Sequence, residues 1–184
     1  IHPFVVSRAT LSTIVTKSRH DGLTGLPRRA ELQRALEQAR QQRPFRGGCV
    51  VMIDLDGFKR INDTLGHQAG DAVLRRFARV ARAALRQGDR VGRLGGDEFA
   101  LVLHGVAPPT ARRVAARLRD RFERESAAEG LSFSFGVAQL RPEEAPQLAL
   151  KRADGSMFRQ KRRRHREGLV GTPARVKAGD RRSG

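Results

Sequence analysis

Two pairs of acidic residues lie next to apolar runs, and their types and spacing suit metal-assisted chemistry on a phosphate. Asp97 and Glu98 directly follow Gly95 and Gly96, and apolar residues lie on both sides of this segment. A glycine pair between apolar runs predicts a β-hairpin with a tight turn. Because glycine has no Cβ, a bulky ligand can lie against the backbone of this turn.

The second pair, Asp54 and Asp56, ends a continuous apolar run over residues 49–53. Such a run predicts a buried central strand. An unpaired buried carboxylate is costly, so we expect both acids at the end of the strand, where a metal neutralises them. Two solvated acids opening a turn are the alternative, and that alternative would be preferred for Asp54 alone. Together with the acidic hairpin, the pair favours a Mg²⁺ site for a nucleotide phosphate.

Helices and strands must bring these acids together. Apolar residues at helical spacing and flanking turn signals predict five helices, over residues 27–42, 57–65, 69–85, 108–124 and 145–164. Apolar runs predict strands near 49–56, in a hairpin over 90–103 and at 131–139. Thr110 is a candidate N-cap for its helix. This order predicts an α/β fold with a mixed, largely antiparallel central sheet flanked by helices.

The composition fits one domain with a proper core, since the chain has 184 residues and 39% hydrophobic content. Cys49 is the only cysteine, which excludes an intrachain disulfide and suggests an inert core thiol. No apolar stretch approaches the length needed to span a bilayer. The first residue is Ile1 rather than Met. We therefore expect a cytoplasmic fragment whose absent upstream part holds a sensor or a membrane anchor.

The chain is strongly basic, with 37 Lys and Arg against 19 Asp and Glu and a formal net charge of +18. This balance is compatible with nucleic acid, a membrane surface or a polyphosphate substrate. A nucleic-acid role is disfavoured, because the chain has no Trp and no Tyr to stack on bases. Residues 1–20 are expected to be an incoming linker or the end of a helix. Residues 167–184 are expected to form a basic, disordered tail.

Residues Gly95 to Phe99 spell the motif that names the GGDEF domain family, the diguanylate cyclases of bacterial signalling. The chain resembles this family over residues 21–166, with several further segments in the same order. The matching segments are Asp21 to Pro27, Asp54 to Asp63, Gly66-His67, Gly70-Asp71, Ser132 to Ala138, and Ala153 to Lys161. The resemblance implies a palm-like sheet related to those of nucleotidyl cyclases.

The resemblance also implies an activity: two GTP molecules are joined into the second messenger cyclic di-GMP, and two pyrophosphates are released. Because the product is two-fold symmetric, a homodimer of GTP-loaded domains is the expected catalyst. Two alternatives remain open. The chain could be a non-catalytic module that senses GTP or cyclic di-GMP for a partner domain, or it could be a basic nucleic-acid binder.

For the metal site, the resemblance implies Mg²⁺ (or Mn²⁺) held by Asp54, the backbone carbonyl of Leu55, Asp97 and Glu98. Asp97 is also expected to help deprotonate the attacking hydroxyl, although a metal-bound alkoxide would serve as well. Glu98 and Lys59 complete the expected catalytic set, with Lys59 stabilising charge on the phosphates. A solvated helix lysine is the alternative for that residue.

For the substrate, the resemblance implies that Asn62 and Asp71 recognise guanine, because a carboxylate can accept both N–H groups of its Watson–Crick edge. Without the resemblance, Asn62 would be interpreted as a polar helix residue and Asp71 as a helix cap. His67 is expected to be a structural hydrogen-bonding group. The whole expected substrate-binding set is Gly57, Phe58, Asn62, His67, Asp71, Gly95, Gly96, Lys161, Arg164 and His165.

The residues of the last helix that are expected to bind the phosphates of GTP depart from the family pattern. Lys161 matches the phosphate-binding lysine of the last helix, but His165 stands where the family usually has an arginine after a glycine. Arg164 or Arg166 could take over, since a guanidinium forks onto phosphate oxygens.

An allosteric product-inhibition site is expected at Arg86 and Asp89, an Arg-x-x-Asp at the family's spacing from Gly95. A surface ion pair is the alternative. The second arginine of that site is expected to be Arg117 or Arg119.

Overall fold

A computed structural model describes residues 19–42 and 44–166 of the chain. The elements in order are α2 (Arg29–Gln41), β1 (Gly48–Asp56), α3 (Phe58–Leu65), α4 (His67–Ala84), β2 (Arg90–Gly95), β3 (Glu98–His104), α5 (Pro108–Glu125), β4 (Ser132–Gln139) and α6 (Pro146–Arg166). Each predicted helix and strand is present. The predicted tail at 167–184 and nearly all of the predicted linker at 1–20 lie outside the described residues.

The four strands form one sheet in the order β2-β3-β1-β4. All three ladders of this sheet are antiparallel. A parallel contact occurs beside them as an isolated bridge between Arg28 and Arg93. The expected α/β fold with a largely antiparallel sheet is therefore confirmed, with β1 and β3 at the centre of the sheet.

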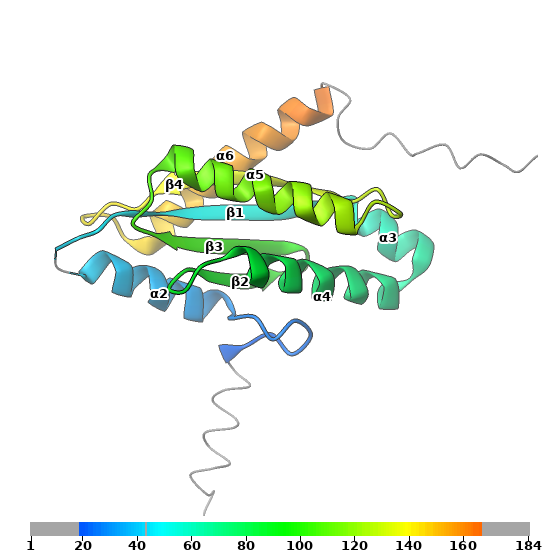
Figure 1. Cartoon of the computed structure of the whole chain (residues 1–184), viewed down its shortest axis with the longest axis horizontal. Helices are drawn as coiled ribbons and strands as arrows, with labels where there is room; N and C mark the ends of the chain where they lie inside the picture. Colours follow the sequence, from blue (N-terminus) through cyan, green and yellow to red (C-terminus); the bar gives the residue numbers. More distant parts are fainter. Residues whose placement is uncertain (1–18, 43, 167–184) are drawn as a thin grey trace, which may run out of the picture.

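Helices cover both faces of the sheet, as Figure 1 shows. Side chains alternate along a strand, so β1 contributes to two cores. Val51, Ile53 and Leu55 pack in the larger core with residues of α3, α4 and α5. Val50 and Met52 pack in a second core with residues of α2 and α6. The alternation places Asp54 on the second face, toward α2 and α6.

Helix α6 packs very closely on the edge strand β4. A Cβ at Gly136 would lie 2.1 Å from the Ala153 carbonyl oxygen and 2.2 Å from the Met157 nitrogen. Only glycine allows this approach, because any larger residue would push the helix away. The close packing fixes where the C-terminal part of α6 meets the end of β1.

Two smaller expectations have different outcomes. Cys49 is buried, and burial raises the pKa of its thiol to about 11, as suits an inert core residue. The capping role of Thr110 is wrong, because α5 begins at Pro108 after Ala107 and has no side-chain cap. Proline at the first turn, with its fixed φ, begins this helix instead. Within residues 19–42 and 44–166, no helix combines the length and apolar character needed to cross a membrane.

Candidate active site

The predicted acidic residues meet at one end of the sheet. Asp54 of β1 lies directly opposite Glu98 of β3 in the antiparallel register. The Leu55 N–H donates to the Asp97 carbonyl oxygen at 3.2 Å, so the turn is bonded to the end of β1. Facing residues on neighbouring strands have Cβ atoms roughly 5 Å apart. The two acid-bearing segments therefore lie close enough to act on one ligand.

The glycine turn is held by Arg93, the residue two positions before Gly95. Its guanidinium donates to the Gly96 carbonyl oxygen at 2.7 and 3.0 Å and to both carboxylate oxygens of Asp21 at 3.1 Å. Gly96 has a φ of +42°, which favours glycine. A Cβ at Gly95 or Gly96 would meet nothing within 4 Å, so the space beside the turn is open. The bracing roles of Arg93 and Asp21 were not predicted, although both lie within or beside recognised segments.

Two acids at this end of the sheet have raised pKa values. Burial, followed by the Asp54 charge, raises the pKa of Asp97. The same two causes, in the same order, raise the pKa of Glu98. Clustered carboxylates that resist ionisation are common where a cation binds or a proton is transferred.

Lys161 of α6 enters this cluster. Its Nζ lies 2.5 Å from Asp54 Oδ1 and 4.0 Å from Asp56 Oδ1. Burial lowers the pKa of Lys161, but the Asp54 hydrogen bond and the charges of Asp54, Asp56 and Asp97 raise it overall. The lysine expected to bind phosphate therefore contacts an expected metal ligand.

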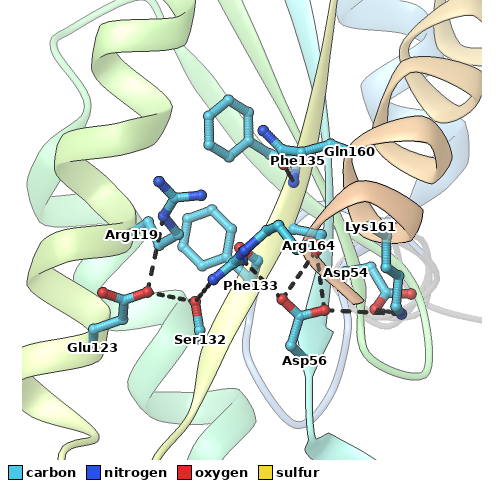
Figure 2. A network of polar contacts seen from close by, with 11 residues as sticks. Asp54, Asp56, Arg119, Glu123, Ser132, Phe133, Phe135, Gln160, Lys161 and Arg164 are labelled. Carbon is cyan, nitrogen blue, oxygen red and sulfur yellow. Dashed lines mark hydrogen bonds and ion pairs between the residues drawn. The ribbon is translucent and has the colours of Figure 1, made fainter. Parts of the chain in front are cut away.

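Asp56 is a buried carboxylate held by the protein itself, as Figure 2 shows. The Ser134 hydroxyl donates to it at 3.0 and 3.1 Å, and Arg164 Nη1 lies 3.1 Å from Oδ2. Burial, the largest influence, raises the pKa of Asp56, while Ser134 and Arg164 oppose that effect. Asp56 thus has cationic and hydroxyl partners without a metal ion.

Arg164 points inward rather than toward open solvent. Besides Asp56, it donates to the Phe133 carbonyl oxygen at 3.0 Å and to the Ser132 hydroxyl at 3.4 Å. These contacts join α6 to the ends of β1 and β4 (Figure 2). Direct phosphate binding by Arg164 is therefore disfavoured in this arrangement. His165 follows in α6, but its side chain lies outside the described part of the structure, and Arg166 is exposed.

The expected guanine and phosphate residues lie on α3 and α4, beyond the end of β1. Gly57, with a φ of +83°, precedes α3, and the helix then begins at Phe58. Lys59 is exposed one residue later. Asn62 lies against α4, because a Cβ at Gly70 would fall 1.9 Å from its Oδ1.

Asp71 follows Gly70 immediately in α4 and is partly exposed. It lies within α4, a helix that has Gly66 as its N-cap residue, so it does not cap that helix. His67 is the first residue of α4 and is exposed.

The expected product site lies at the other end of the sheet. Arg86 Nε is 3.3 Å from Asp89 Oδ2, and the His104 N–H donates to Asp89 Oδ1 at 3.0 Å. Arg86 also donates to the His104 carbonyl oxygen. His104 pairs with Gly48 at the start of β1, whereas the active-site pair lies six residues further on, roughly 20 Å along the strand.

The two candidate second arginines of that site differ in their surroundings. Arg117 lines a cavity of about 370 Å³ between α4 and α5, together with Ala84, which lies two residues before Arg86. Arg119 instead has its Nε 3.8 Å from Glu123 Oε1, and its Cζ lies 5.3 Å from the Phe135 ring centroid. The structure therefore favours Arg117 as the neighbour of the Arg86 segment.

The expected metal ligands are chemically suited to Mg²⁺, since carboxylate and backbone oxygens are its preferred protein ligands. Within residues 19–42 and 44–166, however, no group of three or more His, Cys, Asp or Glu side chains is arranged as a metal cage. Asp54, Asp97 and Glu98 are neighbours, but Asp54 contacts Lys161. Ligand oxygens from a bound triphosphate would be needed to complete such a site.

Comparison with known families agrees with this geometry. The family model described as "Diguanylate cyclase, GGDEF domain" matches residues 18–167. The chain belongs to the GGDEF domain family. Its relatives include Diguanylate cyclase DgcP of Pseudomonas aeruginosa, 38% identical over 153 residues, and Diguanylate cyclase TpbB of the same species, 40% identical over 166 residues. These matches cover 79% and 82% of the chain but only 23% and 37% of the relatives.

Solved structures of GGDEF proteins share the fold. Diguanylate cyclase SiaD of Pseudomonas aeruginosa, crystallised with its activator SiaC, has a TM-score of 0.75 and 35% identity, covering 85% of this chain and 63% of that one. The coiled coil and GGDEF domain of DgcB from Caulobacter crescentus, in complex with c-di-GMP, has a TM-score of 0.74 and 28% identity. That match covers 84% of this chain and 86% of the DgcB chain.

Proposed function

We propose that this chain is the catalytic domain of a diguanylate cyclase, which condenses two GTP molecules into cyclic di-GMP and releases two pyrophosphates. The observation that carries the proposal is the register that sets Asp54 opposite Glu98, with Asp97 bonded through its carbonyl to Leu55. The identity of the chain to proteins named diguanylate cyclases supports the same activity.

Asp54, the Leu55 carbonyl, Asp97 and Glu98 would hold the divalent ion. When bound there, Mg²⁺ supplies positive charge that neutralises the phosphates during transfer. Asp97 also assists deprotonation of the attacking 3′-hydroxyl. Burial and the Asp54 charge raise the pKa of Asp97, and a divalent ion bound there would oppose that shift.

Phosphate binding falls to the start of α3 and to two lysines. Gly57 and Phe58 offer backbone N–H groups at a helix N-terminus, where anions are stabilised. Lys59 and Lys161 add positive charge, and Lys161 exchanges Asp54 for a phosphate oxygen when GTP binds. Arg164 supports this step by holding α6 to Asp56. Guanine recognition falls to Asn62 and Asp71, and the proposal is supported by Asn62 lying against Gly70, the residue before Asp71.

Catalysis requires two domains. Each 3′-hydroxyl must attack the α-phosphate of the other GTP, so a two-fold homodimer aligns both reactions. One domain alone binds only one of the two substrates. We therefore expect the rate per domain to rise steeply with protein concentration.

Product inhibition is assigned to the segment with Arg86 and Asp89, with Arg117 nearby. The guanidinium can fork onto a guanine edge or a phosphate of cyclic di-GMP. The DgcB structures were solved in complex with c-di-GMP, which supports the proposal of product binding by this chain. Calorimetry that finds no cyclic di-GMP binding, or binding unchanged by Arg86→Ala, rejects this assignment.

The experiment that tests the activity is release of pyrophosphate from GTP and Mg²⁺, measured across a range of protein concentrations. A cyclase gives a rate per domain that increases with concentration. A non-catalytic sensor, the second candidate, binds GTP or cyclic di-GMP and releases no pyrophosphate even where sedimentation shows a dimer. His165, at the expected arginine position, is the feature that keeps this second candidate in view.

A further inference from the structure

A cavity of about 380 Å³ lies at the β4 edge of the sheet, between the beginning of α5 and the middle of α6. Its lining includes Arg112, Val137, Lys151, Arg152, Ser156 and Arg159. None of the residues assigned above to the metal, GTP or product lines it. Val137 pairs with Val51, three residues before Asp54, so the cavity lies about 10 Å along the strand from the acidic cluster.

The charges around this cavity are of one sign, because four cationic and no acidic side chains line it. Arg152 is neutralised by Glu144, whose Oε1 accepts from its Nε at 2.8 Å. Arg112, Lys151 and Arg159 make no ion pair with an acid among residues 19–42 and 44–166. All three side chains are exposed, so water and salt screen their mutual repulsion, and a multiply charged anion bound beside them would interact favourably with all three.

The backbone of β4 adds a hydrogen-bond donor. Every second residue of a strand directs its N–H and C=O to the same side. On the outer side of β4, the Phe135 N–H donates to Gln160 at 2.8 Å (Figure 2), and the Gln139 carbonyl accepts from Arg152 at 2.6 Å. Val137 lies between these two residues, so its N–H is directed to the same side, at the cavity.

We propose that this cavity is a binding site for a small, multiply charged phosphate anion, either free pyrophosphate or the phosphate group of a nucleotide. Guanidinium groups bind phosphate oxygens in a bidentate manner, and the Ser156 hydroxyl and the Val137 N–H add neutral donors. The volume lies at the lower end of the range for small-ligand pockets, roughly 300 to 1,000 Å³. The proposal does not depend on whether the chain makes cyclic di-GMP.

The test is calorimetric titration of the full chain with pyrophosphate in 150 mM salt, a concentration chosen to screen non-specific attraction, roughly at physiological ionic strength. The titration is carried out in a Lys161→Ala background, which removes the lysine expected to bind phosphate at the acidic cluster. The Arg112→Ala/Arg159→Ala double variant should weaken pyrophosphate binding at least tenfold. Arg113→Ala is the matched control, since this exposed neighbour of Arg112 is not part of the lining.

Equal weakening by Arg113→Ala, or no pyrophosphate binding at all, overturns the proposal. A second measurement needs no variant: on addition of pyrophosphate, the amide NMR signal of Val137 should shift, and the signals of exposed residues remote from the cavity should not. An unmoved Val137 signal also overturns it. Competition by guanosine monophosphate identifies a nucleotide phosphate as the ligand, whereas failure to compete identifies the free anion.

Discussion

Asp54 of β1 and Lys161 of α6 are 107 positions apart in the sequence, yet the lysine Nζ lies 2.5 Å from the carboxylate Oδ1. In this ion pair, Asp54, which is expected to bind the metal, contacts Lys161, which is expected to bind phosphate. Under the proposed function, metal and triphosphate would bind together, because a phosphate that attracts Lys161 would also free Asp54. The pair therefore links two parts of the candidate site that the sequence suggested separately.

Replacement of Lys161 with alanine should strengthen Mn²⁺ binding in the absence of nucleotide, by about threefold to tenfold, since the ammonium no longer competes for Asp54. The same variant should raise the KM for GTP. Electron paramagnetic resonance of free Mn²⁺ measures the first effect, with Arg162→Ala as the control on the same helix. Equal Mn²⁺ affinity in Lys161→Ala and the unaltered chain would show that the two cations do not compete.

Arg164→Ala should destabilise the domain by about 3 kcal/mol, because it leaves Asp56 buried without its arginine partner. A melting temperature several degrees lower would report this loss. Adding Asp56→Asn to Arg164→Ala should recover part of the stability, because the unpaired charge is gone. If Arg164→Ala and the double variant have the same melting temperature as the unaltered chain, the contact between Arg164 and Asp56 has no role in holding α6. If Arg164 has only a structural role, the KM for GTP should be unchanged in Arg164→Ala. If Arg164 also positions Lys161, the KM for GTP should rise in this variant.

Gly70→Ala should damage guanine binding while leaving the sheet intact. Its Cβ would lie 1.9 Å from Asn62 Oδ1, so the amide must move. We expect at least a tenfold loss of GTP affinity, measured by calorimetry, and a smaller effect of Gln68→Ala on the exposed side of the same helix. Unchanged GTP affinity in Gly70→Ala would place the base elsewhere.

Cys49 gives a pH-dependent prediction. Burial raises the pKa of its thiol from 9.0 to about 11, so the folded protein holds the proton more tightly than the unfolded chain. Its contribution to stability is complete below pH 9 and is lost as the pH rises through 11. At pH 8.5, alkylation by iodoacetamide should be at least tenfold slower in the native protein than in guanidinium chloride. Equal rates would mean that the thiol is accessible.

Much of the fold could be predicted because its signals are local. The apolar run before Asp54 and the glycine pair before Asp97 each indicate a strand or a turn, and the structure joins them in one sheet. The acidic pairs themselves indicated a metal site, whereas the exact ligand set and the guanine-binding residues came from the family pattern. Their chemical roles stay predictions until binding and turnover are measured.

The contacts that could not be predicted connect residues far apart in the chain. The inward turn of Arg164 depends on a buried carboxylate 108 positions away, and the brace between Arg93 and Asp21 spans 72 positions. Neither contact has a periodic signal, since each depends on how α6 and the opening segment pack on the sheet. Thr110 failed as a cap because the preceding prolines already begin the helix.

The most direct test of the central claim is the yield of cyclic di-GMP from GTP and Mg²⁺, measured by chromatography and mass spectrometry for the chain and for Asp97→Asn at equal concentration. We predict cyclic di-GMP with two pyrophosphates per product for the unaltered chain, and at least a hundredfold less for the folded variant. No product from the unaltered chain at a concentration where it is dimeric, or equal product from Asp97→Asn, would contradict a shared catalytic site at Asp54, Asp97 and Glu98.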